Sequence, residues 1–369
     1  MILYLILFLA LFLFFYGFFI YPLLLWVIDR IYNNKTRGVL SDHSEGVTVV
    51  ISVKNETSNI VNKLHNLFSL DINELLLEVI VVSDGSSDNT PALVKKYPSK
   101  NLRVIISDTN NGKPVSLNTA LSIAKFNRVI FADSRQIFDS KVVAELIDSL
   151  SLPNVVCVSG ELFPKRSNKG IGTGVDLYWK IEKFIRRVES DLYSSIGCTG
   201  AIYAIKPSSY FPIPSDTLLD DVVIPMKALI NGQRVKFQTG AVAYDYQALD
   251  RSSEARRKTR TIGGNFQMLF RYPEFLINRQ LIISFFYFSH KISRLVSPFA
   301  MLLACILLFV LLPTVYLRLC FLLMLVSGLI ILRFVKLNLF VKLKAFLFLN
   351  SMVFKGLIYY IRAGYKKGW

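Results

Sequence analysis

The chain has 369 residues, of which 53% are hydrophobic. Its mean hydropathy of +0.44 is too high for an ordinary soluble enzyme. The formal net charge is +17. Because the basic residues cluster beside apolar runs, they predict contact with anionic membrane lipids and no nucleic-acid partner. The four cysteines are far apart and lack the spacing of a zinc site or a disulfide framework.

The two ends of the chain are apolar. Residues 1–28 carry no charge, and about 20 apolar residues suffice to span a bilayer. A signal peptide would show a basic start and a small-residue cleavage site, so we predict a retained transmembrane helix. Toward the other end, the pattern predicts an interfacial amphipathic helix at 276–294 and two transmembrane helices within 295–335. Residues 336–369 are predicted to lie in the interface or to form a third span.

Charge asymmetry predicts the orientation of the chain. Basic residues follow the first apolar run and crowd the last segment of the chain. The positive-inside rule therefore predicts an integral protein of the plasma (inner) membrane, with residues 40–275 forming a cytoplasmic domain.

The central region, 40–275, alternates short β-branched apolar runs with helical spacing, which predicts an α/β domain with a mostly parallel sheet. Strands are expected at 47–53, 77–83, 102–107, 128–133 and 155–160. Helices are expected at 57–69, 88–97, 114–125 and 141–150.

A polar cluster follows each of the first four predicted strands, at 54–56, 84–90, 110–113 and 133–136. Ligands of parallel α/β sheets bind beyond the carboxyl ends of the strands, so the four clusters together predict a binding site. Each cluster alone is ambiguous. Asp84 with the following glycine and serines can hold a ribose, a base edge or an anion, or it can form a simple turn before a helix.

Three patterns stand out in the second half of the domain. Residues 176–193 form an amphipathic helix on which Arg186 and Arg187 are predicted to be solvated. Asp220 and Asp221 precede a helix; they are either a general base with a positioning acid or two acids that interact with the helix dipole. Residues 252–267 predict a basic helix start that breaks at a Gly-Gly pair.

The ordered set VKNE, DGSSDNT, NNGK, ADS, CTGAIYAI, LDD and RRKTR resembles family 2 glycosyltransferases with a GT-A fold. It is similar in particular to their membrane-embedded branch, which includes cellulose, hyaluronan and poly-N-acetylglucosamine synthases. The resemblance covers residues 45–270, and the flanking apolar segments match that branch in kind.

The resemblance implies roles for individual residues. Those implied to bind the nucleotide-sugar donor are Lys54, Asn55, Glu56, Asp84, Lys113, Asp133, Arg257 and Arg260. Asp133 matches the first carboxylate of the DxD motif, which implies a Mg²⁺ or Mn²⁺ ion. Thr199 and Gly200 match the acceptor-site strand. Asp220 and Asp221 match the "ED" pair, in which Asp221 takes the role of general base.

Two positions depart from the family pattern. Arg135 replaces the second DxD carboxylate. Its side chain can either substitute for part of the metal's charge or point away into a salt bridge. Thr261 replaces the tryptophan of the QxxRW motif, to whose glutamine and arginine Arg257 and Arg260 correspond. Because that tryptophan belongs to the acceptor end of polymer-making members, its absence argues against processive elongation.

The expected activity is a membrane-bound, inverting hexosyl or N-acetylhexosaminyl transfer from a nucleotide diphosphate donor, with a UDP-sugar as the expected donor. The acceptor is expected to be a glycan or a lipid-linked molecule in surface or extracellular polysaccharide synthesis. Processive synthesis and single-sugar transfer both stay open. An alternative of a different class is a catalytically inactive membrane scaffold that binds glycan.

Overall fold

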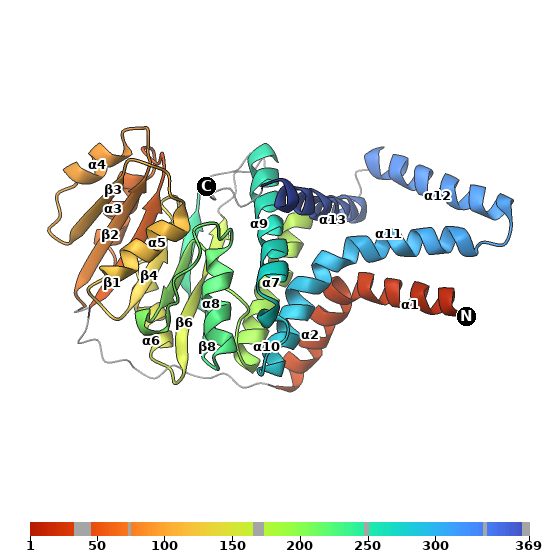
Figure 1. The fold of residues 1–369 in the computed structure, drawn as a ribbon, viewed down its shortest axis with the longest axis horizontal. Coiled ribbons are helices and arrows are strands. Elements are labelled where there is room, and N and C mark those ends of the chain that lie inside the picture. Colours follow the sequence, from red (N-terminus) through yellow and green to blue (C-terminus); the bar gives the residue numbers. More distant parts are fainter. Residues whose placement is uncertain (33–45, 73–74, 165–172, 247–250, 335–337, 364–369) are drawn as a thin grey trace.

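The computed structural model describes residues 1–32, 46–72, 75–164, 173–246, 251–334 and 338–363. An α/β domain lies at one end of the molecule, and apolar helices project from the other (Figure 1). The strands are β1 (Val47–Val53), β2 (Leu77–Asp84), β3 (Leu102–Ser107), β4 (Val129–Ala132), β5 (Ile137–Phe138), β6 (Val155–Pro164), β7 (Ile202–Ile205) and β8 (Arg234–Asp245).

These strands form one sheet in the order β3-β2-β1-β4-β7-β6-β8-β5. The first four in this order are mutually parallel, as the continuous apolar runs predict. Strand β7 is antiparallel to both of its neighbours, and β6 is parallel to β8. The predicted α/β fold with a mostly parallel sheet is therefore confirmed, with antiparallel pairs in its second half.

The central strands of the sheet are buried on both faces, which explains their long apolar runs. All residues of β1 and β2 are buried. Alternate residues point to opposite faces, so Val50 and Ile80 belong to one hydrophobic core, while Val49 and Val79 belong to a second core.

The helices of the domain are α3 (Ile60–Phe68), α4 (Thr90–Lys96), α5 (Lys113–Ser122), α6 (Val142–Leu150), α7 (Thr173–Leu192), α8 (Asp220–Ile230) and α9 (Arg251–Arg271). The predicted break at the Gly-Gly pair of α9 is wrong, because the helix continues through Gly263 and Gly264. A Cβ atom would lie 2.6 Å from Tyr359 at the first position and 2.5 Å from Leu219 at the second. The two glycines therefore allow close packing on both sides of the helix.

Among the described residues, two continuous helical runs are long and apolar enough to cross a membrane. Ile2–Ile31 comprises α1 (Ile2–Phe15), a π-helical turn η1 (Tyr16–Ile20) and α2 (Tyr21–Ile31). Leu281–Leu311 comprises α10 (Leu281–Tyr287), a second π-helical turn η4 (Phe288–Ile292) and α11 (Ser293–Leu311). The predicted boundary between an interfacial helix and a span, at residue 294, lies inside this second run.

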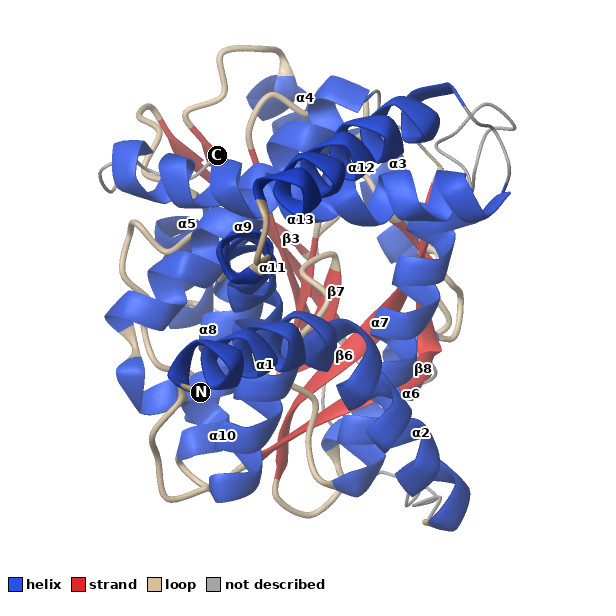
Figure 2. Cartoon of the chain, turned by 90° about the vertical axis from the view of Figure 1, so that its right-hand side faces the viewer, coloured by secondary structure: helices blue, strands red, loops and turns tan. Residues whose placement is uncertain are grey.

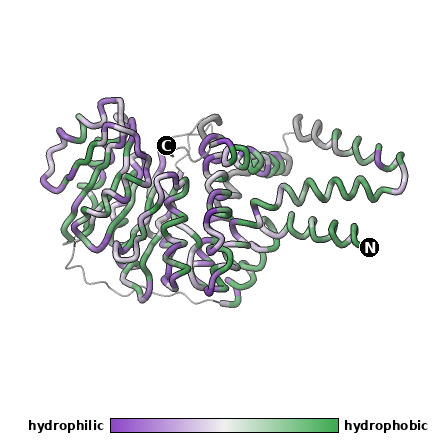
Figure 3. The backbone as a smooth tube through the Cα atoms, in the orientation of Figure 1, coloured by the Kyte–Doolittle hydropathy of each residue, from purple (hydrophilic) through white to green (hydrophobic). Residues whose placement is uncertain are grey.

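Helices α1 and α11 run side by side away from the sheet, and their residues are hydrophobic almost throughout (Figures 1 and 3). The chain continues through α12 (Val315–Phe334) and returns as α13 (Asn338–Ala363). Helix α13 packs against α9 and α7. Seen from the side of the projecting helices, α1 and α13 lie in front of the strands (Figure 2).

Candidate active site

The polar clusters after the parallel strands meet at one edge of the sheet, as predicted. The Asp84 carboxylate at the end of β2 accepts hydrogen bonds from the backbone N–H groups of Asn111 and Gly112, at 2.8 and 2.7 Å. On its other side, the Asn55 side-chain oxygen accepts a bond of 2.8 Å from the Ser87 N–H. These contacts fix the loops relative to one another. Asp84 and Asn55, which we predicted to bind the donor, therefore hold this edge of the sheet together.

A cavity of about 580 Å³ opens beside this edge. Most of the predicted site residues line it: Glu56, Lys113, Asp133, Thr199, Gly200, Asp220, Asp221, Arg257 and Arg260. Lys54, Asn55 and Asp84 do not line it. The fold thus gathers residues separated by about two hundred positions in the chain into one cavity.

Lys113 lies in the cavity among acidic side chains. It begins α5, and its Nζ lies 3.1 Å from Asp133 Oδ1 and 3.6 Å from Asp220 Oδ2. Burial opposes its charge, but these carboxylates outweigh that effect and raise the pKa of Lys113. The side chain is therefore a permanent cation among acids, positioned to meet an anionic ligand.

Asp220 and Asp221 begin α8 and have different surroundings. Asp220 is buried and accepts a hydrogen bond of 3.2 Å from the Tyr203 hydroxyl. Burial and the charge of Asp220 raise the pKa of Asp221 to about 6, although Lys113 and Arg186 oppose the shift. A carboxylate with a pKa near 6 is a stronger base than an ordinary aspartate, which suits proton abstraction near neutral pH.

The segment before β7 packs against Asp221. A Cβ atom on Gly200 would lie 2.9 Å from Asp221 Oδ2, so glycine is needed for the backbone to approach the carboxylate this closely. The neighbouring Thr199 donates its N–H to Ser159 Oγ at 2.9 Å. Both predicted acceptor residues therefore lie in the segment that packs against Asp221.

The structure places the Arg135 side chain in a salt bridge. Its Nη2 lies 2.6 Å from Oδ2 of Asp245, at the end of β8, and Gln136 Nε2 contacts the same oxygen at 3.2 Å. Of the two alternatives left open by the sequence, this contact favours the salt bridge.

A divalent cation would have few protein ligands here. Within the described residues no group of three or more His, Cys, Asp or Glu side chains could hold a metal. Asp133 is 41% exposed and faces the cavity. A single carboxylate fits Mg²⁺ or Mn²⁺ when diphosphate oxygens and water complete the coordination shell.

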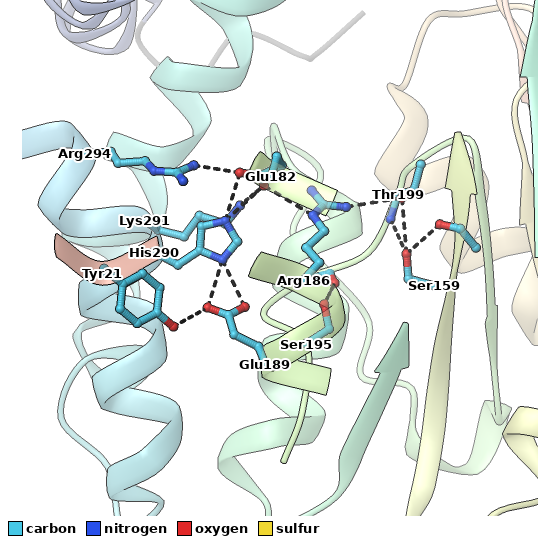
Figure 4. A network of polar contacts seen from close by, with 12 residues as sticks. Tyr21, Ser159, Glu182, Arg186, Glu189, Ser195, Thr199, His290, Lys291 and Arg294 are labelled. Carbon is cyan, nitrogen blue, oxygen red and sulfur yellow. Dashed lines mark hydrogen bonds and ion pairs between the residues drawn. The ribbon is translucent and has the colours of Figure 1, made fainter. Parts of the chain in front are cut away.

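Sequence reasoning missed a buried cluster on α7, which we call the His290 cluster: Tyr21, Glu182, Arg186, Glu189, His290, Lys291 and Arg294. His290, from η4, lies between two carboxylates of α7 (Figure 4). Its Nε2 is 3.0 Å from Glu182, and its Nδ1 is 3.0 Å from Glu189. The Tyr21 hydroxyl donates to Glu189 at 2.6 Å. The available signal was the spacing of seven residues between the two glutamates, which places them on one helical face.

The predicted solvation of Arg186 is wrong. Its Nε lies 3.2 Å from Glu182, and its Nη1 donates to Thr199 Oγ1 at 3.2 Å. Arg187 pairs instead with Asp29 of α2 at 2.7 and 3.1 Å. The helix periodicity was right, but it gave no information on these long-range partners.

Comparison with known proteins identifies this architecture. Residues 48–210 match the model "Glycosyl transferase family 2". Poly-β-1,6-N-acetyl-D-glucosamine synthase of Staphylococcus aureus strain COL is 25% identical over 252 residues, which are 62% of this chain and 60% of that protein. The Staphylococcus epidermidis synthase is 23% identical over 248 residues, 61% of this chain and 58% of that protein. The match thus spans less than two thirds of these curated relatives.

A solved structure supports the fold. The mannosyltransferase PcManGT from Pyrobaculum calidifontis, in complex with GDP-Man and Mn²⁺, covers 98% of this chain and 99% of its own, with a TM-score of 0.76 and 20% identity. Residues 48–210 therefore form a domain of the glycosyl transferase family 2 type, and the chain has a GT-A fold.

Proposed function

We propose that the protein is a membrane-bound inverting glycosyltransferase that moves a sugar from a UDP-sugar to a glycan or lipid-linked hydroxyl in polysaccharide synthesis, on the cytoplasmic side of the membrane. The observation that carries this proposal is the placement of Lys113, Asp133 and Asp221 in one cavity. This arrangement puts a cation, a candidate metal ligand and a base where a diphosphate donor and a hydroxyl can meet. The names of the curated relatives support polysaccharide synthesis.

In the proposed reaction, Asp221 accepts the proton of the acceptor hydroxyl. The hydroxyl oxygen forms a bond to the anomeric carbon, and the bond from that carbon to the diphosphate breaks. The electron pair leaves with the nucleoside diphosphate. Lys113, Arg257 and Arg260 line the cavity and would neutralise the charge of this leaving group. A divalent cation at Asp133 would supply further positive charge at the diphosphate.

Release of nucleoside diphosphate by the purified full-length chain tests the donor. Among UDP-N-acetylglucosamine, UDP-glucose and GDP-mannose, we expect one UDP-sugar to give turnover. Lys113→Gln is expected to lower kcat/KM by about 100-fold, because one charge-stabilising group is worth about 3 kcal/mol. Lys96→Gln, an exposed lysine of α4, is the matched control.

Two results would contradict the proposal. If calorimetry detects no binding of any of these donors, the inactive-scaffold alternative gains. If GDP-mannose alone is turned over, the UDP assignment fails. The length of the products then separates processive synthesis, which gives a ladder of long chains, from single transfer.

Metal removal is expected to slow the reaction. EDTA should lower the rate by at least about tenfold, and Mn²⁺ or Mg²⁺ should restore it, because the metal stabilises diphosphate charge by several kcal/mol. Asp133→Asn should raise the Mn²⁺ concentration needed for half-maximal rate, which a metal titration measures. A rate that is unchanged in EDTA would show that the cations of the cavity suffice without a metal.

A further inference from the structure

The cavity continues past the base toward the apolar helices. Its lining there includes Phe18 of η1, Leu295 of α11, and Leu349 and Val353 of α13. The first two belong to the two helical runs that are long and apolar enough to cross a membrane. The cavity thus joins the carboxylates of the reaction centre to the lipid side of the molecule.

Three cations line the cavity in this region. Arg186, Lys291 and Arg294 have side chains only 18%, 14% and 13% exposed, and all three pair with Glu182, at 3.2, 3.4 and 2.6 Å. Burial tends to raise the pKa of Glu182, but His290 and the neighbouring cations outweigh burial and hold it well below its ordinary value. Glu182 is therefore ionised, and its carboxylate pairs with all three cations.

Other charged side chains among the described residues also lie near these cations. Glu189 lies on the far side of His290, fully buried, and accepts a hydrogen bond from Tyr21. Lys183 adds no net charge, because it pairs with Glu161 at 2.6 Å. Three cationic side chains therefore line one part of the cavity together, and Asp221 is a further acid that acts on Arg186. An anionic group entering the cavity would meet three charged donors there.

One of these cations contacts the predicted acceptor segment. Arg186 donates to Thr199, and the adjacent Gly200 touches the Asp221 carboxylate. Lys113, which we assign to the donor diphosphate, contacts the acid pair through Asp220. Asp221 therefore has two cationic neighbours from different elements, Lys113 and Arg186.

We infer that the acceptor is a sugar joined through a phosphate to a lipid, with the phosphate at Arg186, Lys291 and Arg294 and the lipid chain along the apolar lining. This inference rests on the proposed function and names its acceptor class. The phosphate is not the nucleophile, because an ionised phosphate oxygen needs no base. A sugar hydroxyl gives its proton to Asp221 and attacks the donor, and the phosphate holds that sugar in place.

The phosphate and the lipid are tested separately by calorimetry on the full-length protein in detergent, with farnesyl phosphate, farnesol and inorganic phosphate as probes. Farnesyl phosphate is expected to bind at least about tenfold more tightly than either of the others, since each lacks one of the two recognised parts. Lys291→Gln should weaken its binding by about tenfold, the usual loss for one charged hydrogen bond. Lys291→Arg should restore most of the binding.

Arg186→Gln and Arg187→Gln form a matched pair on one helix. The first removes a cavity cation and should also weaken farnesyl phosphate binding by about tenfold. The second removes the pairs with Asp29 and Asp191 but no cation of the cavity, and it should change this binding by less than about twofold. Equal losses in both variants would indicate a general effect on the fold and overturn the inference.

Other outcomes also overturn it. Farnesol binding as tightly as farnesyl phosphate would show an apolar site without anion recognition. Inorganic phosphate binding as tightly would show an anion site without a lipid. If farnesyl phosphate displaces the UDP-sugar, the phosphate occupies the donor region instead. Because donor binding is measured on its own, a protein that binds a UDP-sugar but not farnesyl phosphate refutes this inference and leaves the proposed function standing.

Discussion

Replacing Asp221 by asparagine is expected to lower kcat by about 100- to 10,000-fold, the usual contribution of a general base. Asparagine keeps the size of the side chain but cannot accept the proton of the acceptor hydroxyl. Donor binding should change little, because Lys113 and Asp133 are untouched. Nucleoside diphosphate release measures the rate, and calorimetry measures the donor affinity.

Asp220→Asn is the informative comparison for this variant. Asp220 contacts Tyr203 and Lys113 and raises the pKa of Asp221. Its loss should shift the pH dependence downward while keeping a base in place. If Asp221→Asn retains wild-type activity and Asp220→Asn does not, the assignment of the two acids must be exchanged.

The same base predicts the pH profile. With a pKa of about 6, Asp221 is ionised and able to accept a proton above pH 6, and it becomes protonated below it. The value of kcat/KM should therefore fall by about tenfold per pH unit below pH 6 and level off above pH 6. Because burial raises this pKa, an ordinary exposed aspartate would instead place the fall near pH 4.

Replacing Glu182 by glutamine is expected to lower the free energy of unfolding by about 3–5 kcal/mol, as for other buried ion pairs that lose one partner. Glutamine leaves Arg186, Lys291 and Arg294 without their common counter-charge. Thermal unfolding in detergent measures the loss. Glu274→Gln removes an exposed carboxylate and serves as the control.

A double variant separates charge from shape at this position. Adding Lys291→Gln to Glu182→Gln removes one of the uncompensated cations, so part of the lost stability should return. If the loss of stability in the double variant instead equals the sum of the two single losses, repulsion among the cations does not cause the destabilisation.

The regular half of the domain could be predicted from sequence because its signals are local. Continuous β-branched runs identified β1 to β4, and the rule that ligands bind at the carboxyl ends of parallel strands brought the four polar clusters together. The contacts of Asp84 with Asn111 and of Lys113 with Asp133 confirm that this edge is assembled as expected.

The features that escaped prediction depend on partners distant in the chain. The composition of the Gly263–Gly264 pair predicts a break in the helix. Both glycines nevertheless lie inside α9, because Tyr359 and Leu219 pack against the helix there. Arg186 was assigned to solvent by its position on a helix, and its partner Thr199 comes from a different element. His290 formed no local pattern, since both of its carboxylates are on α7, about one hundred positions earlier.

The N-terminal helix is joined to α7 by the apolar packing of Tyr21 and Leu25 against Ile185 and Val188 and by the hydrogen bond from Tyr21 to Glu189. Helix α7 also carries Glu182 and Arg186, which line the cavity. A change in the tilt of the N-terminal helix would therefore turn α7 and displace these two side chains. Spanning helices adjust their tilt to the thickness of the bilayer. We therefore expect the acyl-chain length of the surrounding lipids to affect the shape of the cavity near Glu182 and Arg186.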